Sequence, residues 1–157
     1  MGNSLPNKLK TLYIGSVYDK EKGEIPLFVT DDFKKAFVRH VELVKLETDK
    51  RDFEEKINAP NRYAFIFGGK FCIIKLIQFD GNDKFCILSE KLNEYESPYS
   101  YHTSEEDAML SIKRFMNIDS ITTKADGSRI VDGSIDKSKN WRWSTASRYI
   151  IRTFNIK

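Results

Sequence analysis

Residues 63–79, with the sequence YAFIFGGKFCIIKLIQF, decide the fold class of this chain. Two runs rich in aromatic and β-branched residues flank Gly68-Gly69, and this pattern predicts a β-hairpin. The second run, residues 70–79, is apolar on both faces of a strand apart from Lys75 and Gln78. We therefore expect it to be a central strand that is covered on both sides.

A third strand is predicted at residues 84–90, joined to the second by the turn residues 80–83. Antiparallel pairing across that turn places Cys86 opposite Ile77. Cys72 then lies on the other face of this hairpin and several residues further along it, too far away for a disulfide. The two cysteines are therefore expected to be buried thiols in a cytosolic protein.

The N-terminal third predicts two strands, at residues 11–18 and 25–29, followed by a helix. Pro26 would place the second strand at a sheet edge, because proline cannot donate to a ladder. Thr30 is the expected helix N-cap, since it is followed by two aspartates near the positive end of the helix dipole.

The helix that follows carries one apolar stripe at helical spacing. Its members are Phe33, Ala36, Phe37, His40, Val41 and Val44. A straight continuation would place Phe53 about 200° around from Phe33. We therefore expect the helix to break near Thr48, and a short helix to carry Phe53 and Ile57.

The C-terminal half predicts a polar connection at residues 92–102 and then a helix opened by a capping box, Thr103 to Glu106. A further hairpin is expected from residues 119–123 and 128–131. Residues 141–157 fit either a helix or a strand.

Together these elements predict an α+β fold: an antiparallel sheet of about five to seven strands, with two main helices and one short helix packed on it. The 157 residues are expected to form a single domain, residues 1–157, without an internal repeat. The apolar runs are too short to span a bilayer and no secretory signal is recognised, so we expect a cytoplasmic protein without membrane contact.

Charge is distributed unevenly along the chain. The formal net charge is +3, but residues 121–157 carry eight basic against three acidic residues, which leaves a net charge of −2 on the first 120. This basic third also holds both tryptophans, and arginine beside aromatic rings suits phosphates and stacked bases. The candidate nucleic-acid-binding residues are Lys137, Lys139, Trp141, Trp143, Arg142, Arg148 and Arg152. Docking of the same segment onto the sheet, with its arginines in water or paired with the acidic helices, is the simpler explanation of the pattern.

A second candidate surface is rich in tyrosine, a residue enriched at protein interfaces. Tyr95, Tyr99 and Tyr101 lie in the polar connection, and Leu110 falls opposite the apolar stripe of the second helix. This group predicts a partner-binding patch and allows a homodimer.

Catalytic signals are weak. His102 is the one candidate catalytic residue, because it lies in a polar connection close to Glu105 and Glu106. No metal-ligand spacing and no cofactor motif is present, so no metal or cofactor is expected.

The leading hypothesis is therefore a small non-enzymatic adaptor or inhibitor that binds a protein partner. The Lys/Asn/Ile/Tyr/Phe-rich composition fits an accessory protein of a phage or another mobile element. The alternatives are a nucleic-acid-binding protein that uses the basic third, and a small phosphodiesterase or nuclease that uses His102.

Overall fold

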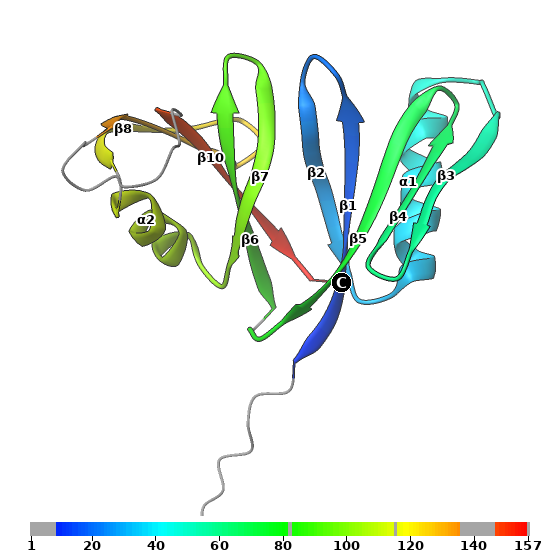
Figure 1. Cartoon of the computed structure of the whole chain (residues 1–157), viewed down its shortest axis with the longest axis horizontal. Coiled ribbons are helices and arrows are strands. Elements are labelled where there is room, and N and C mark those ends of the chain that lie inside the picture. The colour runs from blue at the N-terminus through cyan, green and yellow to red at the C-terminus, as the bar shows by residue number, and fades with distance from the viewer. Residues whose placement is uncertain (1–8, 82, 115, 136–146, 157) are drawn as a thin grey trace, which may run out of the picture. The chain divides into compact units, whose positions relative to one another are not determined.

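The computed structural model describes residues 9–81, 83–114, 116–135 and 147–156 (Figure 1). Within these residues the chain forms two helices and ten strands. In chain order they are β1 (Lys10–Asp19), β2 (Gly23–Thr30), α1 (Phe33–Glu47), β3 (Phe53–Ala59), β4 (Arg62–Phe67), β5 (Lys70–Phe79), β6 (Lys84–Leu92), β7 (Tyr95–His102), α2 (Glu105–Lys113), β8 (Met116–Thr123), β9 (Arg129–Ile135) and β10 (Arg148–Asn155).

The strands hydrogen-bond in the order β3-β4-β5-β1-β2-β7-β6-β10-β9-β8. Most pairs with a defined register are antiparallel, whereas β2 and β7 pair in parallel at Gly23 and Glu96. The described strands therefore form one mixed sheet.

The chain folds into two compact units. Among the described residues, unit 1 comprises residues 9–18, 27–81, 83 and 155–156, and unit 2 comprises residues 19–26, 84–114, 116–135 and 147–154. Each unit is thus assembled from separate stretches of the chain. This interleaving explains why the sequence shows no domain linker.

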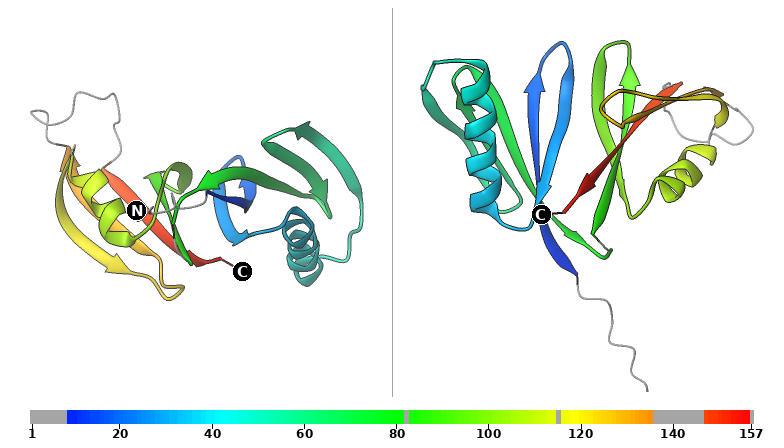
Figure 2. Two further views of the ribbon diagram at one scale, coloured as in Figure 1. Left: turned by 90° about the horizontal axis from the view of Figure 1, so that it is seen from below. Right: turned by 180° about the vertical axis from the view of Figure 1, so that it is seen from behind.

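Each unit buries its own core under its own helix. In unit 1, α1 packs across the strands (Figure 2), and its core includes Phe28, Ala36, Val44, Phe65, Phe67, Cys72 and Ile74. In unit 2, α2 packs on a core that includes Cys86, Leu88, Ala108, Ile112, Met116, Val131, Tyr149 and Ile151. Apolar residues at strand and helix spacing thus meet on one face of the strands in each unit.

The two units share one topology, which the sequence does not reveal as a repeat. The order β1-β2-α1-β3-β4-β5 of the first half matches β6-β7-α2-β8-β9-β10 of the second. The spatial orders also match, since β3-β4-β5-β1-β2 corresponds to β8-β9-β10-β6-β7. The order of elements therefore repeats, although no internal repeat is found among the residues.

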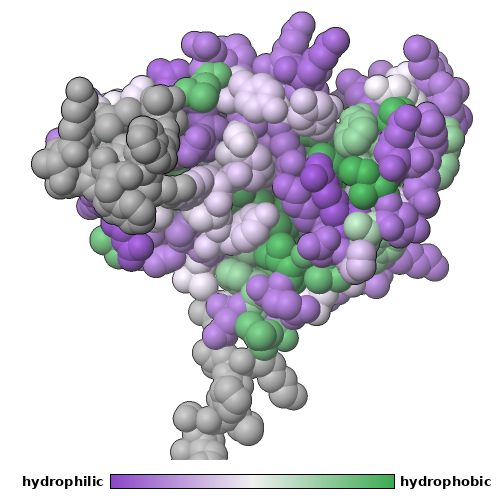
Figure 3. Space-filling view, viewed as in Figure 1, coloured by the Kyte–Doolittle hydropathy of each residue, from purple (hydrophilic) through white to green (hydrophobic). Residues whose placement is uncertain are grey.

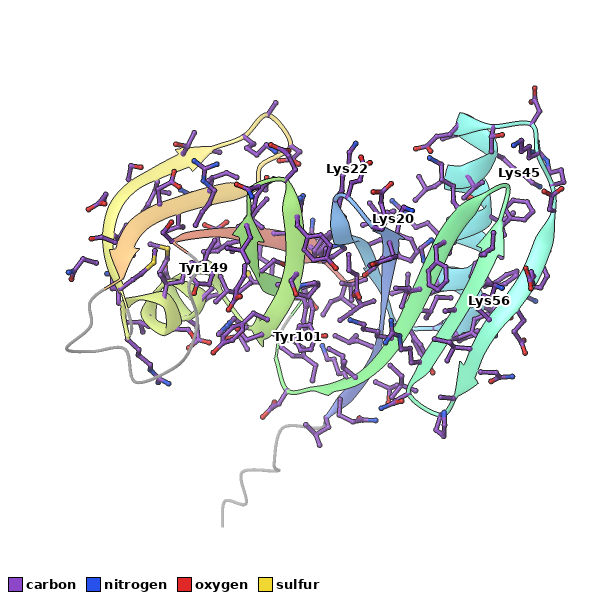
Figure 4. The ribbon with its side chains drawn as sticks, turned by 45° about the horizontal axis from the view of Figure 1, so that its top comes forward. Lys20, Lys22, Lys45, Lys56, Tyr101 and Tyr149 are labelled. Atoms are coloured by element: carbon purple, nitrogen blue, oxygen red, sulfur yellow. The ribbon has the colours of Figure 1, made fainter. Side chains whose placement is uncertain are left out.

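A β-bulge occurs in the same strand of both units, the one directly after the helix. In β3 the register shifts between Glu55 and Ile57, which leaves Lys56 as the extra residue (Figure 4). In β8 it shifts between Ile118 and Ser120, which leaves Asp119. β3 and β8 are the outermost strands of the order, and charged residues at bulges discourage edge-to-edge pairing with other chains.

The predicted fold class is wrong in strand number and in pairing. The antiparallel sheet of five to seven strands proves to be a mixed sheet with ten strands among the described residues. The segment predicted as a polar connection forms β7, and the described part of the undecided C-terminal segment forms β10. Hydrogen bonding to neighbouring strands, which sequence patterns do not record, decides these segments.

The predicted short helix is also wrong, because its residues form β3. Glutamate and lysine at positions 54–56 favour helix by propensity. In the structure the segment pairs with β4, and the ring of Phe53 stacks on Phe65 with centroids 5.6 Å apart. Tertiary packing therefore overrides local propensity here.

The predicted hairpin between β5 and β6 does not form. β5 lies between β4 and β1, so both of its edges are occupied. Ile77 consequently pairs with Leu12, and Cys86 pairs with His102. Three consecutive buried residues of β5, Cys72 to Ile74, confirm that this strand is covered on both faces.

Both helices begin one or two residues later than predicted. Asp32 caps α1 by accepting from the backbone of Lys35, while the Thr30 hydroxyl donates to the Asp32 carbonyl. Ser104 caps α2 by accepting from the backbone of Asp107. The end of α1 at Thr48 is as predicted.

No helix among the described residues is long and apolar enough to cross a membrane. Hydrophilic residues dominate the face of the molecule seen in Figure 3, and hydrophobic residues occur there in small groups.

Gly15 of β1 supports α1 indirectly, because the ring of Phe28 packs directly against it. A Cβ atom at Gly15 would lie 2.1 Å from that ring. The ring is 4% exposed, and its centroid lies 4.8 Å from that of His40. It therefore has little room to move.

Gly15→Ala is expected to lower the free energy of unfolding by about 1–3 kcal/mol through overpacking. Chemical denaturation of Gly15→Ala, Phe28→Leu and the double variant measures the effect. The leucine makes room, so the cost of the double variant should fall below the sum of the single costs. Strict additivity would contradict this explanation.

Candidate functional site

Unit 1 holds a pocket of about 550 Å³ where the start of α1 meets the strands and the β3–β4 turn. Four aromatic rings, two aliphatic side chains and the turn line it: Tyr13, Phe33, Phe37, Tyr63, Ile74, Leu76 and residues 58–62. Its volume lies within the range of roughly 300–1,000 Å³ that is typical of ligand pockets.

The aromatic rings of the pocket form a preassembled surface. Phe33, the first residue of α1, is 39% exposed, and its ring meets Tyr13 and Tyr63 nearly edge-on at 6.0 and 5.4 Å between centroids. Phe37 extends this surface to Phe53, whose ring lies 6.0 Å away and is 50% exposed. Rings held against one another lose little freedom when a ligand covers them.

Polar groups at the pocket are few. The Tyr63 hydroxyl donates to Glu55, and partial burial together with this hydrogen bond raises the pKa of Tyr63. Arg62 carries the one formal charge among the lining residues, and Asn58 and Asn61 add two amides. A mostly apolar lining with a few polar groups suits an apolar ligand that makes a small number of hydrogen bonds.

The shared topology identifies the equivalent position in unit 2. Counting from the two bulges, the pair Tyr63–Ile74 of unit 1 corresponds to the pair Val131–Tyr149 of unit 2. Tyr149 is fully buried and lies beside α2 (Figure 4). A tyrosine thus fills, in unit 2, the place of the shorter Ile74.

The first residues of the two helices also differ in chemistry. Phe33 begins α1, whereas α2 begins with Glu105. Glu105 forms an ion pair with Arg129 at 2.6 Å and accepts a hydrogen bond from Thr153. Unit 1 therefore presents aromatic rings where unit 2 has an ion pair.

The structure does not bring the predicted tyrosine patch together. Tyr99 packs against the core under α2, while Tyr101 packs on Phe85, with ring centroids 5.4 Å apart. Leu110 lies on α2 and is 60% exposed. Tyr95 is also exposed, at the start of β7. Tyr101 and Leu110 lie on different sides of the strands of unit 2, because α2 packs on the opposite face from Tyr101.

Two of the predicted nucleic-acid-binding residues are described, and both carry acidic partners. Arg148 pairs with Asp132 at 2.6 Å, and this raises the pKa of Arg148. Arg152 forms two hydrogen bonds with Glu96, of 2.9 and 2.7 Å, and approaches Asp126 at 3.5 Å.

The remaining members of this predicted set lie outside the described residues: Lys137, Lys139, Trp141, Arg142 and Trp143. The charges of Arg148 and Arg152 are thus each paired with an acidic side chain within unit 2.

His102 ends β7 and lies between two polar side chains. Its Nε2 atom is 2.6 Å from the Ser100 hydroxyl, and its Nδ1 atom is 2.7 Å from an Asp107 carboxylate oxygen. The His102 side chain is only 10% exposed. An acid therefore lies within hydrogen-bond reach of this histidine, although His102 does not line the pocket of unit 1.

The thiols are unsuited to nucleophilic chemistry. Cys72 and Cys86 are free and buried, as predicted. Burial raises the pKa of Cys72 to about 12, and burial also raises that of Cys86 although its hydrogen bond to Thr153 opposes the shift. In the part of the chain that the structure describes, no group of His, Cys, Asp and Glu side chains is arranged to hold a metal ion.

The sequence did not reveal the pocket as a functional site. Phe33 and Phe37 were assigned to the buried stripe of α1, and Tyr13 and Tyr63 to strands. In the structure Phe33 is the first helical residue, directly after the N-cap Asp32, whereas the expected N-cap Thr30 placed it inside the first turn.

The described residues thus form a mixed sheet with two helices, built of two topologically equivalent units, and unit 1 carries a pocket lined by aromatic rings. No family model, no curated protein and no solved structure matches this chain. Its function must therefore be argued from its own geometry.

Proposed function

We propose that the chain is a protein-binding module whose unit 1 pocket takes a large apolar side chain of a partner. The observation that carries this proposal is the row of touching aromatic rings that lines the pocket and continues into solvent. Large apolar anchors seated in such pockets supply much of the energy of protein interfaces.

The exposed rings beside the pocket favour a protein over a small molecule. A small molecule seated between Tyr13 and Tyr63 would leave Phe53 and part of Phe33 in water. A protein partner would bury these rings together with the pocket, and each additional 100 Å² of apolar area is worth about 2.5 kcal/mol before the costs of association. Arg62 at the rim would suit a carboxylate next to the apolar anchor.

A peptide library displayed on phage, selected against the whole chain, tests this function. Peptides that bind the wild-type protein should share a Trp, Phe or Leu anchor. The key variant is Ile74→Tyr, which fills the pocket with the residue that unit 2 has at the equivalent position. Synthetic versions of the selected peptides should bind this variant about thirtyfold more weakly, as when a hot-spot contact worth about 2 kcal/mol is lost.

Tyr101→Ala provides the matched control, since it removes a partly exposed aromatic residue of unit 2. It should change affinity less than about twofold. Equal binding of the peptides to wild type and Ile74→Tyr would refute the pocket as the binding site. Salt-sensitive binding to labelled DNA or RNA, unaffected by Ile74→Tyr, would instead assign the function to the basic C-terminal third.

A further inference from the structure

Three side chains of unit 2 form a continuous hydrogen-bonded series that the pocket does not involve. Ser100 Oγ lies 2.6 Å from His102 Nε2, and His102 Nδ1 lies 2.7 Å from Asp107 Oδ2. The order is hydroxyl, imidazole and carboxylate, with one imidazole nitrogen for each partner. This is the arrangement that activates a serine hydroxyl, and it is recognised by geometry and not by sequence position.

The backbone explains how three residues so close in sequence come together. Ser100 and His102 are two residues apart on β7, so their side chains share one face of the strand. Asp107 lies in the first turn of α2, where its backbone N–H donates to the hydroxyl of the cap residue Ser104 at 3.1 Å. The cap thereby fixes the position from which the carboxylate reaches the imidazole.

The carboxylate also decides which way the hydrogen bonds run. An ionised Asp107 only accepts, so His102 Nδ1 must carry a proton and donate it. In the neutral imidazole Nε2 then holds a lone pair, which accepts from the Ser100 hydroxyl. Because the His102 side chain is 10% exposed, the surrounding structure holds the ring in place.

We infer that Ser100 is a nucleophile for acyl transfer from small carboxylic esters, with His102 as its general base and Asp107 as a positioning residue. Ser100 Oγ bonds to the ester carbonyl carbon while its proton passes to His102 Nε2. The carbon–oxygen bond of the leaving alcohol then breaks, and His102 returns the proton to that oxygen. Water repeats the sequence, releases the carboxylic acid and restores the serine.

An alkyl fluorophosphonate tests this inference without any variant. The Ser100 oxygen should displace fluoride from phosphorus and remain covalently attached, while His102 takes the serine proton. After exposure of the native full-length chain, peptide mapping by mass spectrometry compares Ser100 with Ser97. Ser97 is exposed on the same strand, so it controls for simple accessibility. Modification of Ser100 at least a hundredfold faster than Ser97 supports the inference, and equal rates overturn it.

Variants distinguish an activated Ser100 hydroxyl from a hydrogen-bonded series with a purely structural role. Asp107→Asn should lower the Ser100 modification rate by 10²-fold or more, because the amide no longer fixes the tautomer of His102. Ser97→Ala should leave the rate unchanged. Hydrolysis of 4-nitrophenyl acetate should be lost in Ser100→Ala, a variant that removes a single oxygen atom. An unchanged rate of hydrolysis in a folded Ser100→Ala would overturn the inference.

Discussion

Arg152→Met is expected to lower the free energy of unfolding by about 3–5 kcal/mol at neutral pH, because it leaves a buried carboxylate without its partner. Glu96 is 2% exposed and accepts both of its hydrogen bonds from one guanidinium, at 2.9 and 2.7 Å. The pair links β10 to β7, which are separated by β6 in the strand order. Burial opposes the charge of Arg152, yet its bonds to Glu96 and Asp126 raise its pKa above the ordinary value.

The matched control is Arg148→Met, which removes an arginine from the same strand. Arg148 pairs with Asp132, but half of the Arg148 side chain and a third of the Asp132 side chain are exposed. This change should cost much less than Arg152→Met, because an exposed ion pair contributes little to stability. Urea denaturation of both variants gives the comparison, and similar costs at the two positions would contradict a role for burial.

Glu96 also fixes the tip of the β1–β2 hairpin. Its backbone N–H donates to the carbonyl of Lys22 at 2.8 Å, and it pairs with Gly23. Gly23 has φ +81°, and a Cβ atom there would lie 2.1 Å from the Glu96 carbonyl oxygen. One buried residue therefore joins the hairpin tip, β7 and β10 within unit 2, so the loss of its ionic partner is expected to affect the whole unit.

Local patterns predicted those parts of the fold that local chemistry decides. The Gly68-Gly69 hairpin has both glycines at positive φ and forms as expected, as does the hairpin that turns at Gly127. Ala36, His40 and Val44 of the helical stripe are buried, as expected, whereas Phe33 is partly exposed. In each case the deciding residues are neighbours in sequence.

The pairing of strands that are far apart in the sequence cannot be predicted from such local patterns. The turn residues at 80–83 favour a hairpin, but β1 occupies the edge of β5 that β6 would need. The topological repeat is similarly hidden, because equivalent positions such as Ile74 and Tyr149 carry different residues.

The candidate sites were hidden for a related reason. Sequence analysis identified His102 but not its partners, because the capping box was expected to begin at Thr103 and Asp107 was given no role. The pocket needs three separate segments, at Tyr13, Phe33 and Tyr63, to meet. Residue type predicts that these aromatic side chains are apolar, and only the packing determines which of them remain open to solvent.

The unfolding free energy of the wild-type chain is expected to fall by about 3 kcal/mol as the pH decreases from 6.5 to 4, because of His40. His40 is 1% exposed, and burial lowers its pKa to about 4, although its hydrogen bond to the Ile73 carbonyl opposes the shift. The unfolded state therefore binds a proton at higher pH than the folded state does. The neutral histidine contributes its full stability above about pH 6.5, and this contribution is lost as the pH falls towards 4.

His40→Gln is the informative variant, because glutamine keeps an N–H donor for the Ile73 carbonyl, 2.9 Å from His40 Nε2, but does not titrate. Its unfolding free energy should be lower than that of the wild type at pH 7.5, since the ring contacts with Phe28 and Phe65 are lost. Denaturation at several pH values should show that the slope between pH 6.5 and 4 disappears in His40→Gln. His102→Gln, which changes the other histidine of the chain, should retain that slope. If His40→Gln also retains it, the acid sensitivity belongs to the carboxylates instead.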